Sequence, residues 1–197
     1  MVKLYFAVIF TFLLSDKFAE QNYIERYFAL AVSEMDRSGI PASIILAQGI
    51  LESNNGNSRL ARNSNNHFGI KCKSYWTGDK YYHYDDDFDQ NGKLIQSCFR
   101  SYNSVKDSYK DHSNFLLQST RYANLFLLDK NYKKWSHGLK RSGYATDPKY
   151  AEKLIKVIER NKLYEFDTPT NKMTSTHDWG EENIKKYTKP KYTKFAY

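Results

Sequence analysis

The chain has 197 residues, a formal net charge of +8 and an aromatic content of 16%, with 17 tyrosines. This length is enough for one domain of ordinary size plus short extra segments, and a basic, tyrosine-rich surface suits nucleic acid, an anionic membrane or an anionic glycan polymer. Two cysteines cannot form a structural zinc site without histidines as further ligands, and the histidines are not spaced as metal ligands. We therefore expect no metal and no cofactor.

The N-terminus has the pattern of a secretory signal. Residues 1–3 supply a short basic start, and residues 4–14 are apolar but for one position, a run too short for a comfortable membrane span. Ala19 is a small residue suited to cleavage, although Lys17 is unfavourable two positions earlier. We predict a signal peptide over residues 1–19 and export to the periplasm, the cell wall or the extracellular space. An uncleaved N-terminal anchor is the alternative.

Two helices are predicted after the signal. Residues 22–25 have the sequence of a capping box, and apolar residues then recur at helical spacing up to Gly39. Pro41 suits the first turn of a second helix, which runs to Ser53 and is apolar almost all round. Such a helix is buried, and its last turn contains Glu52.

Glu52 is the only glutamate between Glu34 and Glu152. Burial and the negative end of the helix dipole both disfavour its carboxylate, so we expect its pKa to be raised. A carboxylic acid that stays protonated near neutral pH is what a general acid in glycoside cleavage requires. A solvated glutamate at a helix end is the ordinary alternative.

Residues 63–100 have a strand-like pattern instead. The Asn-Gly dipeptide at 91–92 stands between two strand-like runs, which predicts a β-hairpin. Cys72 precedes this hairpin and Cys98 ends it, and in an exported protein such a pair indicates one disulfide. A cysteine–histidine peptidase is the alternative. It would need a free thiol at a helix start, whereas both cysteines flank strand-like segments.

Helices return after the hairpin. We predict one from Ser104, one through residues 132–139, and one from Asp147, where an N-cap residue precedes a proline. After about Asp167 the apolar periodicity stops, and we predict a flexible basic tail over residues 168–197. The expected fold class is therefore α+β, with helices and a small β-hairpin in separate parts of the domain.

Several separate segments match one known pattern in the right order. They are Leu-Glu-Ser-Asn-Asn-Gly-Asn-Ser at 51–58, Leu-Ala at 60–61, Asn-Asn-His-Phe-Gly-Ile-Lys at 65–71, Phe-Arg-Ser-Tyr at 99–102 and Gly-Tyr-Ala-Thr-Asp-Pro-Lys-Tyr-Ala at 143–151. This pattern resembles the endo-β-N-acetylglucosaminidases of glycoside hydrolase family 73, whose domain is also found in flagellar peptidoglycan hydrolases.

The resemblance implies a lysozyme-like domain over residues 20–167, in which a mainly helical lobe and a small hairpin lobe form a cleft. It also implies cleavage of the β-1,4 bond between N-acetylglucosamine and N-acetylmuramic acid in peptidoglycan. Glu52 matches the general acid of the family, the same residue to which the burial argument leads.

A second carboxylate is usual for glycoside hydrolysis, and in this family it is commonly a glutamate of the hairpin lobe. This chain has no glutamate between positions 53 and 151, and the candidates are Asp85, Asp86 and Asp87. If the turn at 91–92 has two residues, Asp86 shares a face with the apolar residues of the hairpin. We therefore prefer Asp86, followed by Asp87 and Asp85. An acidic rim or a cation-binding edge strand is the alternative, and a substrate-assisted reaction would need no such base.

Tyr144 matches a family tyrosine near the catalytic acid. Its phenol is expected to orient the acetamido group of the substrate or to hold Glu52 through a hydrogen bond, and a core tyrosine is the alternative. Asp147 in the same motif is better explained as a helix cap. Four further side chains are expected to contact the sugar: His67, Phe68, Trp76 and Tyr150. For the tryptophan, packing within the hairpin lobe is an equal alternative.

The expected partners are glycan strands of peptidoglycan. We expect no nucleic acid, because the signal directs the chain away from it, no stable membrane span after signal cleavage, and a monomer. Two other functions fit the same fold. One is a non-catalytic peptidoglycan-binding module, since the usual hairpin glutamate is missing. The other is a lytic transglycosylase, which also works with one glutamate but leaves an anhydro-muramic end.

Overall fold

The computed structural model describes residues 2–168 of the chain, with the side chains of residues 17–85 and 87–168. In chain order, the elements are α1 (Val2–Ser38), α2 (Ala42–Ser53), α3 (Arg59–Ser64), β1 (Lys80–Phe88), β2 (Leu94–Arg100), α4 (Val105–Gln118), the 3-10 helix η1 (Thr120–Leu127), α5 (Tyr132–Arg141), α6 (Tyr150–Arg160) and the 3-10 helix η2 (Leu163–Asp167).

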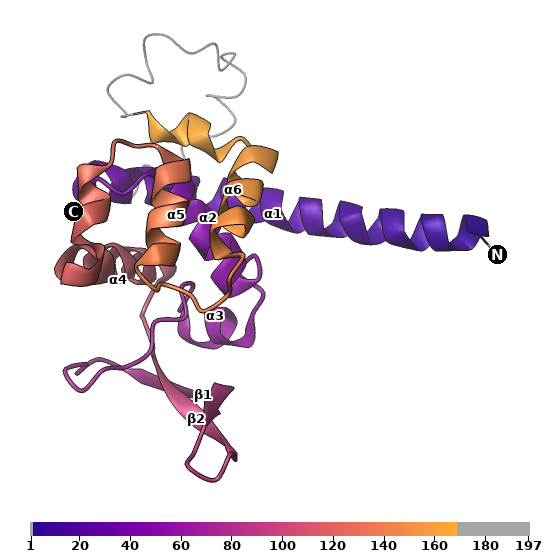
Figure 1. Cartoon of the computed structure of the whole chain (residues 1–197). Coiled ribbons are helices and arrows are strands. Elements are labelled where there is room, and N and C mark those ends of the chain that lie inside the picture. Colours follow the sequence, from indigo (N-terminus) through magenta and orange to yellow (C-terminus); the bar gives the residue numbers. More distant parts are fainter. Residues whose placement is uncertain (1, 169–197) are drawn as a thin grey trace. The chain divides into compact units, whose positions relative to one another are not determined.

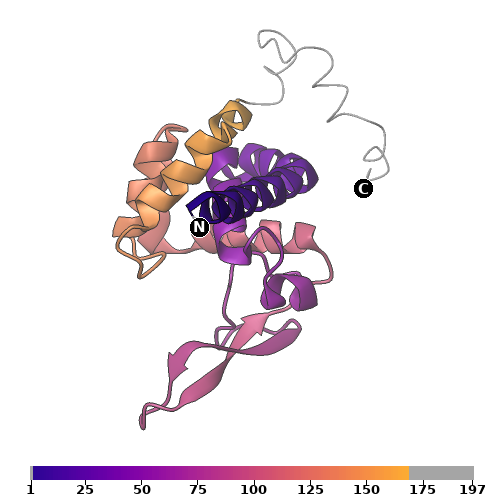
Figure 2. The same cartoon turned by 90° about the vertical axis from the view of Figure 1, so that its right-hand side faces the viewer.

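The domain up to Asp167 has a helical lobe and a hairpin lobe. Helices α1, α2, α4, α5 and α6 pack together, whereas β1 and β2 extend away from them, with α3 at the junction (Figures 1 and 2). The predicted α+β, lysozyme-like architecture is confirmed. The predicted tail at 168–197 lies, apart from its first residue, outside the described part of the chain.

Helix α1 is longer than predicted. It runs through residues 22–25 without a break, because the sequence on both sides of this capping-box pattern contains neither glycine nor proline before position 39. The helix ends where predicted, since Gly39 has a φ of 81° and its N–H donates to Met35 O at 2.8 Å. None of the described helices is long and apolar enough to cross a membrane. The signal peptide over residues 1–19 stays a prediction.

Helix α2 forms the centre of the helical lobe. Its residues 42–50 are all buried, as its apolar sequence predicts. Gly49 lets α1 approach closely, because a Cβ at this position would collide with the Tyr23 hydroxyl. At the other end of the helix, Asp167 accepts hydrogen bonds from the Ser43 N–H at 2.8 Å and from the Ser43 hydroxyl at 2.7 Å. Side chains far away in the sequence therefore fix the position of α2.

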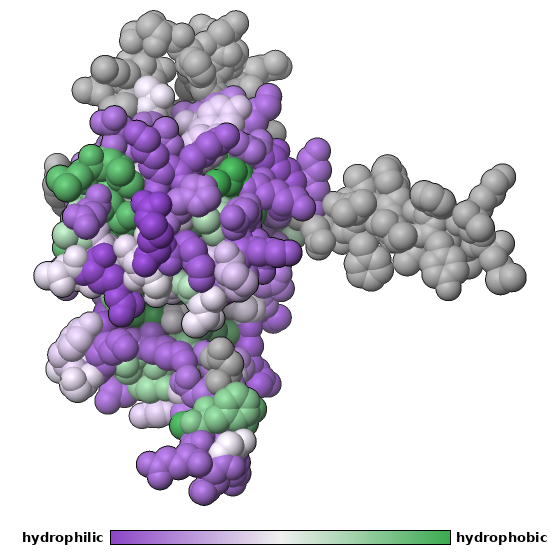
Figure 3. All heavy atoms as spheres, viewed as in Figure 1, coloured by the Kyte–Doolittle hydropathy of each residue, from purple (hydrophilic) through white to green (hydrophobic). Residues whose placement is uncertain are grey.

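The hairpin lobe is tied to the rest of the domain at its base. Antiparallel pairing runs from Lys80 opposite Arg100 to Tyr84 opposite Gln96. The predicted disulfide is confirmed: Cys72 and Cys98 are bonded, and the Cys72 N–H also donates to Cys98 O at 2.8 Å. Near the other end, three large apolar side chains are exposed, and Figure 3 shows a hydrophobic patch in this part of the lobe. They are Phe88, Leu94 and Ile95.

The turn of the hairpin differs from a two-residue turn. Its loop has three residues, 90–92, because Asp89 Oδ1 accepts the N–H groups of Asn91 at 2.8 Å and Lys93 at 2.9 Å, and Gly92 takes a φ of 74°. The register is also irregular between Tyr84 and Phe88, where the three aspartates lie. Side chains therefore do not alternate regularly between the two faces of the hairpin here. The placement of Asp86 on the apolar face, which assumed a two-residue turn, loses its basis.

The helices after the hairpin begin close to their predicted positions. The Ser104 hydroxyl caps α4 by accepting the Asp107 N–H, and α5 covers the predicted stretch. Helix α6 begins at Tyr150 with Lys149 as its N-cap residue, two positions after the predicted N-cap residue Asp147. Asp147 accepts the Lys149 N–H at 2.8 Å and pairs with Lys153 at 2.5 Å. Asp147 thus organises the turn into α6, close to the capping role expected for it.

Candidate active site

The turn after α2 fixes the position of Glu52. Helix α2 ends at Ser53, its C-cap residue Asn54 has a φ of 50°, and Asn55 and Gly56 continue in the left-handed region. The Ser53 hydroxyl braces this turn, since it donates to Gly49 O at 2.5 Å and accepts the Gly56 N–H at 2.7 Å. Glu52 is half-buried at this point, with its carboxyl group presented from a rigid helix end.

Tyr150 holds the carboxyl group of Glu52. Its hydroxyl donates to Glu52 Oε1 at 2.8 Å and accepts a hydrogen bond from Gln48 Nε2 at 3.1 Å. Gln48 lies one helical turn before Glu52 on α2. Because Gln48 occupies a lone pair of the hydroxyl oxygen, the hydroxyl proton is directed toward Glu52. Neither Gln48 nor this role of Tyr150 was predicted.

Burial raises the pKa of Glu52, and the hydrogen bond from Tyr150 opposes this rise without cancelling it. The direction agrees with the sequence argument. A raised pKa keeps part of the carboxyl population protonated at a pH where an ordinary glutamate is ionised. The group can therefore donate a proton.

Tyr144 lies behind Tyr150 and makes no described hydrogen bond to Glu52. Its ring stacks on that of Tyr150, with 5.7 Å between the centroids and an angle of 19° between the planes. The predicted hydrogen bond to the acid thus comes from Tyr150, six residues later in the same motif. Tyr150 is only 4% exposed, and its contact with the sugar stays a prediction. Contact between Tyr144 and an acetamido group stays a prediction.

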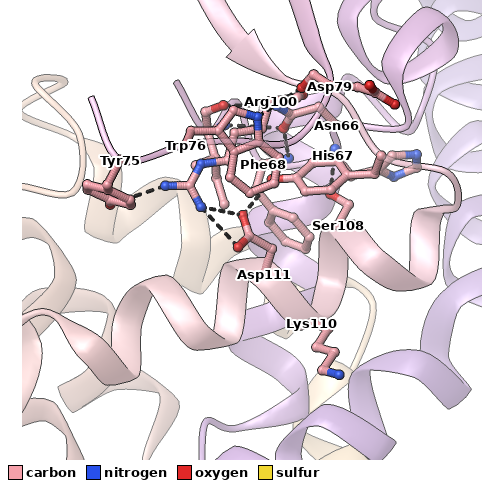
Figure 4. Close-up of polar contacts among 12 residues, drawn as sticks. Asn66, His67, Phe68, Tyr75, Trp76, Asp79, Arg100, Ser108, Lys110 and Asp111 are labelled. Carbon is pink, nitrogen blue, oxygen red and sulfur yellow. Dashed lines mark hydrogen bonds and ion pairs between the residues drawn. The ribbon is translucent and has the colours of Figure 1, made fainter. Parts of the chain in front are cut away.

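His67 and Phe68 are buried, at 2% and 3% exposure, and their contact with the sugar stays a prediction. His67 Nδ1 is hydrogen-bonded to the Tyr23 hydroxyl at 2.9 Å, and burial lowers the pKa of His67 to about 4. Phe68 stacks on His112, with 4.0 Å between centroids. Both side chains support the site from inside the helical lobe (Figure 4).

Asn66 explains why this segment turns inward. Its side-chain nitrogen donates to Ile70 O at 3.0 Å and to Arg100 O at 2.8 Å, and its side-chain oxygen accepts the N–H of Ile70 at 3.1 Å. A buried amide that satisfies three backbone groups holds the loop against the base of the hairpin. The Asn-Asn pair at 65–66 is a weak signal for such a loop, and it does not identify the distant partner.

Trp76 packs at the base of the hairpin lobe. Its ring lies 4.6 Å from the guanidinium carbon of Arg100, and its Nε1 donates to Asp79 O at 2.9 Å. Arg100 is held by Asp111 through two hydrogen bonds of 3.0 and 2.8 Å (Figure 4). This packing matches the alternative for Trp76. The ring remains half-exposed, so its sugar contact stays a prediction.

The acidic segment of β1 contacts one lysine. Lys71 Nζ lies 3.2 Å from Asp85 Oδ2 and 2.6 Å from Asp87 Oδ2, and the Ser97 hydroxyl also donates to Asp87. The hydrogen bonds from Lys71 and Ser97 lower the pKa of Asp87, so it is an anion at neutral pH. The side chain of Asp86, the preferred candidate, lies outside the described part of the structure.

Known proteins share this fold and sequence. A family model described as Glucosaminidase, mannosyl-glycoprotein endo-β-N-acetylglucosaminidase, matches residues 28–163. The peptidoglycan hydrolase FlgJ of Vibrio cholerae is 36% identical over 133 residues, 64% of this chain and 40% of that protein. The exo-glucosaminidase LytG of Bacillus subtilis is 33% identical over 153 residues, 75% of this chain and 54% of that protein. The chain thus spans roughly half the length of these relatives.

Solved structures agree with the sequence comparison. The catalytic domain of the autolysin Auto from Listeria monocytogenes matches with a TM-score of 0.67 at 27% identity, over 76% of this chain and 88% of that chain. The family match covers the segment that contains Glu52, Tyr150 and the hairpin lobe. The chain belongs to the glucosaminidase family, glycoside hydrolase family 73.

Proposed function

We propose that this chain is a peptidoglycan hydrolase that cleaves the β-1,4 bond between N-acetylglucosamine and N-acetylmuramic acid, with Glu52 as the general acid. The observation that carries the proposal is the carboxyl group of Glu52. Burial raises its pKa, and the hydrogen bond from Tyr150 sets its orientation. Two relatives support the same substrate and the same class of bond, since one is named a peptidoglycan hydrolase and the other an exo-glucosaminidase.

The first step is protonation of the glycosidic oxygen by Glu52 as the bond to the anomeric carbon breaks. The electron pair of that bond goes to the leaving oxygen, and positive charge develops on the sugar ring. Glu52 becomes a carboxylate in this step. The Tyr150 hydroxyl, 2.8 Å away, then stabilises the new charge through a charge-assisted hydrogen bond.

The second carboxylate is proposed to come from Asp85, Asp86 or Asp87, with Asp86 preferred. Lys71 neutralises part of the charge of Asp85 and Asp87, whereas a residue that activates water needs an accessible carboxylate. Asp86 is preferred from the sequence pattern alone. A substrate-assisted reaction, in which the 2-acetamido group attacks the anomeric carbon, is the alternative and makes all three aspartates dispensable.

We also propose that the chain acts after export, as a monomer on the cell wall. The basic, apolar start of the sequence supports export, and the net charge of +8 favours residence on an anionic wall polymer. Nucleic acid is not the proposed partner, because the family fold and the acid of α2 are suited to a glycan.

Digestion of purified peptidoglycan tests the function. The full chain and its Glu52→Gln variant are incubated with sacculi, and the new ends are identified by mass spectrometry. Reducing N-acetylglucosamine ends from the wild type alone support the proposal. Anhydro-muramic ends would assign a lytic transglycosylase instead. Intact sacculi that still bind the wild-type protein would assign a non-catalytic binding module.

A further inference from the structure

A pocket of about 330 Å³ is lined by Tyr122. This residue is the first of three tyrosines, Tyr122, Tyr144 and Tyr150, that contact one another in turn and lead to Glu52. One wall is formed by Lys73 and Tyr75, which follow Cys72 at the base of the hairpin lobe, and another by Arg121 and Tyr122 of η1. The pair Arg100–Asp111 also lines it. The pocket therefore spans the junction between the two lobes, where a substrate that contacts both would pass.

Two positive charges at this pocket have no acidic partner among the described side chains. Arg100 is neutralised by Asp111, whose oxygens also accept the Tyr102 hydroxyl at 2.7 Å. Lys73 and Arg121 are exposed, and within residues 17–85 and 87–168 no carboxylate forms an ion pair with either. The pocket thus carries a net positive charge that a ligand carboxylate would balance.

The pocket also has apolar walls. Tyr75 and Tyr122 contribute rings, and Phe115 lies 5.7 Å from Tyr122 between ring centroids. A ligand with small apolar groups next to a carboxylate fits such a surface better than a bare phosphate chain, because the rings bury carbon and the cations bind oxygen.

Ring contacts connect this pocket with the catalytic acid. The Tyr122 ring lies 6.2 Å from that of Tyr144, which stacks on Tyr150, and the Tyr150 hydroxyl binds Glu52. Arg121 also reaches back toward the same motif, since its Nη1 donates to Gly143 O at 3.4 Å. The pocket is thus two ring contacts from the residue that holds the acid.

We propose that this pocket binds a carboxylate of the peptide stem carried by a muramic acid residue close to the cleaved bond. This inference rests on the proposed function, because it takes peptidoglycan as the substrate. Lys73 and Arg121 bind the carboxylate, and the tyrosine rings pack against the small side chains of the stem. The pocket then makes the enzyme prefer glycan that still has its stems.

Binding to three soluble tetrasaccharides tests the inference, with Glu52→Gln as the background so that ligands stay intact. The first ligand has peptide stems, the second has lost them to an amidase and keeps only the lactyl carboxylate, and the third is an N-acetylglucosamine tetramer. The variant Lys73→Gln/Arg121→Gln should bind the first about tenfold more weakly, and the other two unchanged. Lys110→Gln is the matched control, since Lys110 lies on α4 and points away from Arg100 and Asp111 (Figure 4).

Each result decides the inference. An equal loss for the first two ligands would overturn it and assign the lactyl carboxylate as the partner. An equal loss for all three would show that the two cations bind the glycan itself, and no loss for any would show that the pocket does not bind this substrate. The digestion of sacculi by the wild type is read separately. A stem-dependent loss of binding without any cleavage would retain the pocket and reject the hydrolase.

Discussion

The Tyr150 hydroxyl donates to Glu52 Oε1 at 2.8 Å across a sequence separation of 98 residues. Helix α6 thereby supplies the group that orients the acid of α2. This contact lowers the pKa of Glu52, while burial raises it more strongly. The protonation of the acid is thus set by two opposing influences, of which one can be removed by a single substitution.

Tyr150→Phe should raise the pKa of Glu52 further and lower kcat about tenfold, because the carboxylate loses its donor and its orientation. The alkaline limb of the pH profile of kcat/KM should move to higher pH. Tyr132→Phe is the matched control, since it removes a hydrogen bond to Glu159 at 3.2 Å elsewhere in the domain. An unmoved alkaline limb would show that Tyr150 does not tune the acid.

Glu52→Gln should lower kcat by roughly a factor of 10² to 10⁴, the contribution of a general acid. It should also raise the unfolding midpoint at pH 7. The pKa of Glu52 is higher in the folded protein than in the unfolded chain, so its ionised form destabilises the fold above that pKa, and this cost disappears as the pH falls. Thermal unfolding at pH 7 and pH 4 measures the difference. A lower midpoint for the variant at pH 7 would contradict this account.

Single asparagine substitutions at Asp85, Asp86 and Asp87 should identify the second carboxylate. We expect Asp86→Asn to lower kcat about a hundredfold and the other two to have smaller effects, because Lys71 already contacts Asp85 and Asp87. Turnover of soluble glycan at saturating substrate measures this. Three variants with near wild-type turnover would favour the substrate-assisted reaction.

The disulfide should stabilise the domain by about 3 kcal/mol, given the sequence separation of 26 residues between Cys72 and Cys98. Denaturant unfolding of the Cys72→Ser/Cys98→Ser variant, compared with the wild type, gives this value. Reductant should lower the midpoint of the wild type and leave the variant unchanged. A wild-type midpoint that does not respond to reductant under unfolding conditions would contradict the bond.

His112 should make the fold sensitive to acid. Burial lowers its pKa to about 3, and neither ring nitrogen has a hydrogen-bond partner among the described residues. Above pH 6.5 the neutral form of His112 is compatible with the fold. As the pH falls from 6.5 toward about 3, the free energy of unfolding decreases, because the unfolded chain binds the proton first.

His112→Phe should therefore gain stability relative to the wild type as the pH is lowered from about 6.5 to 4. Urea unfolding across this range measures the difference, with His137→Phe on the exposed face of α5 as the control. Parallel pH profiles for wild type and His112→Phe would exclude His112 as the acid-sensitive group.

The central parts of the fold follow from local sequence patterns. The apolar run after Pro41 determines a buried helix, so both α2 and the place of Glu52 at its end could be predicted. The Asn-Gly dipeptide at 91–92 located the hairpin. It did not determine the loop length, because the side chain of Asp89 accepts two N–H groups and favours three residues over two.

Contacts between distant residues determine the parts of the site that the sequence did not predict. His67 and Phe68 follow a polar loop, and their burial depends on distant contacts such as the hydrogen bond from Asn66 to Arg100 O, 34 residues away. Tyr144 and Tyr150 stand in one motif, and the packing of α6 on α2 decides which of them reaches Glu52. Burial of a single aromatic residue is a tertiary property that local spacing does not encode.

Helix α2 is held at both ends by the last elements of the domain. Asp167 binds Ser43 at its first turn, and Tyr150 binds Glu52 at its last turn. A fragment that stops before position 167 would keep every residue of the acid site and yet release the start of the helix that presents it. The shortest fragment with full activity should therefore extend through Asp167, and a fusion at this boundary should keep the Asp167 carboxylate free to bind Ser43.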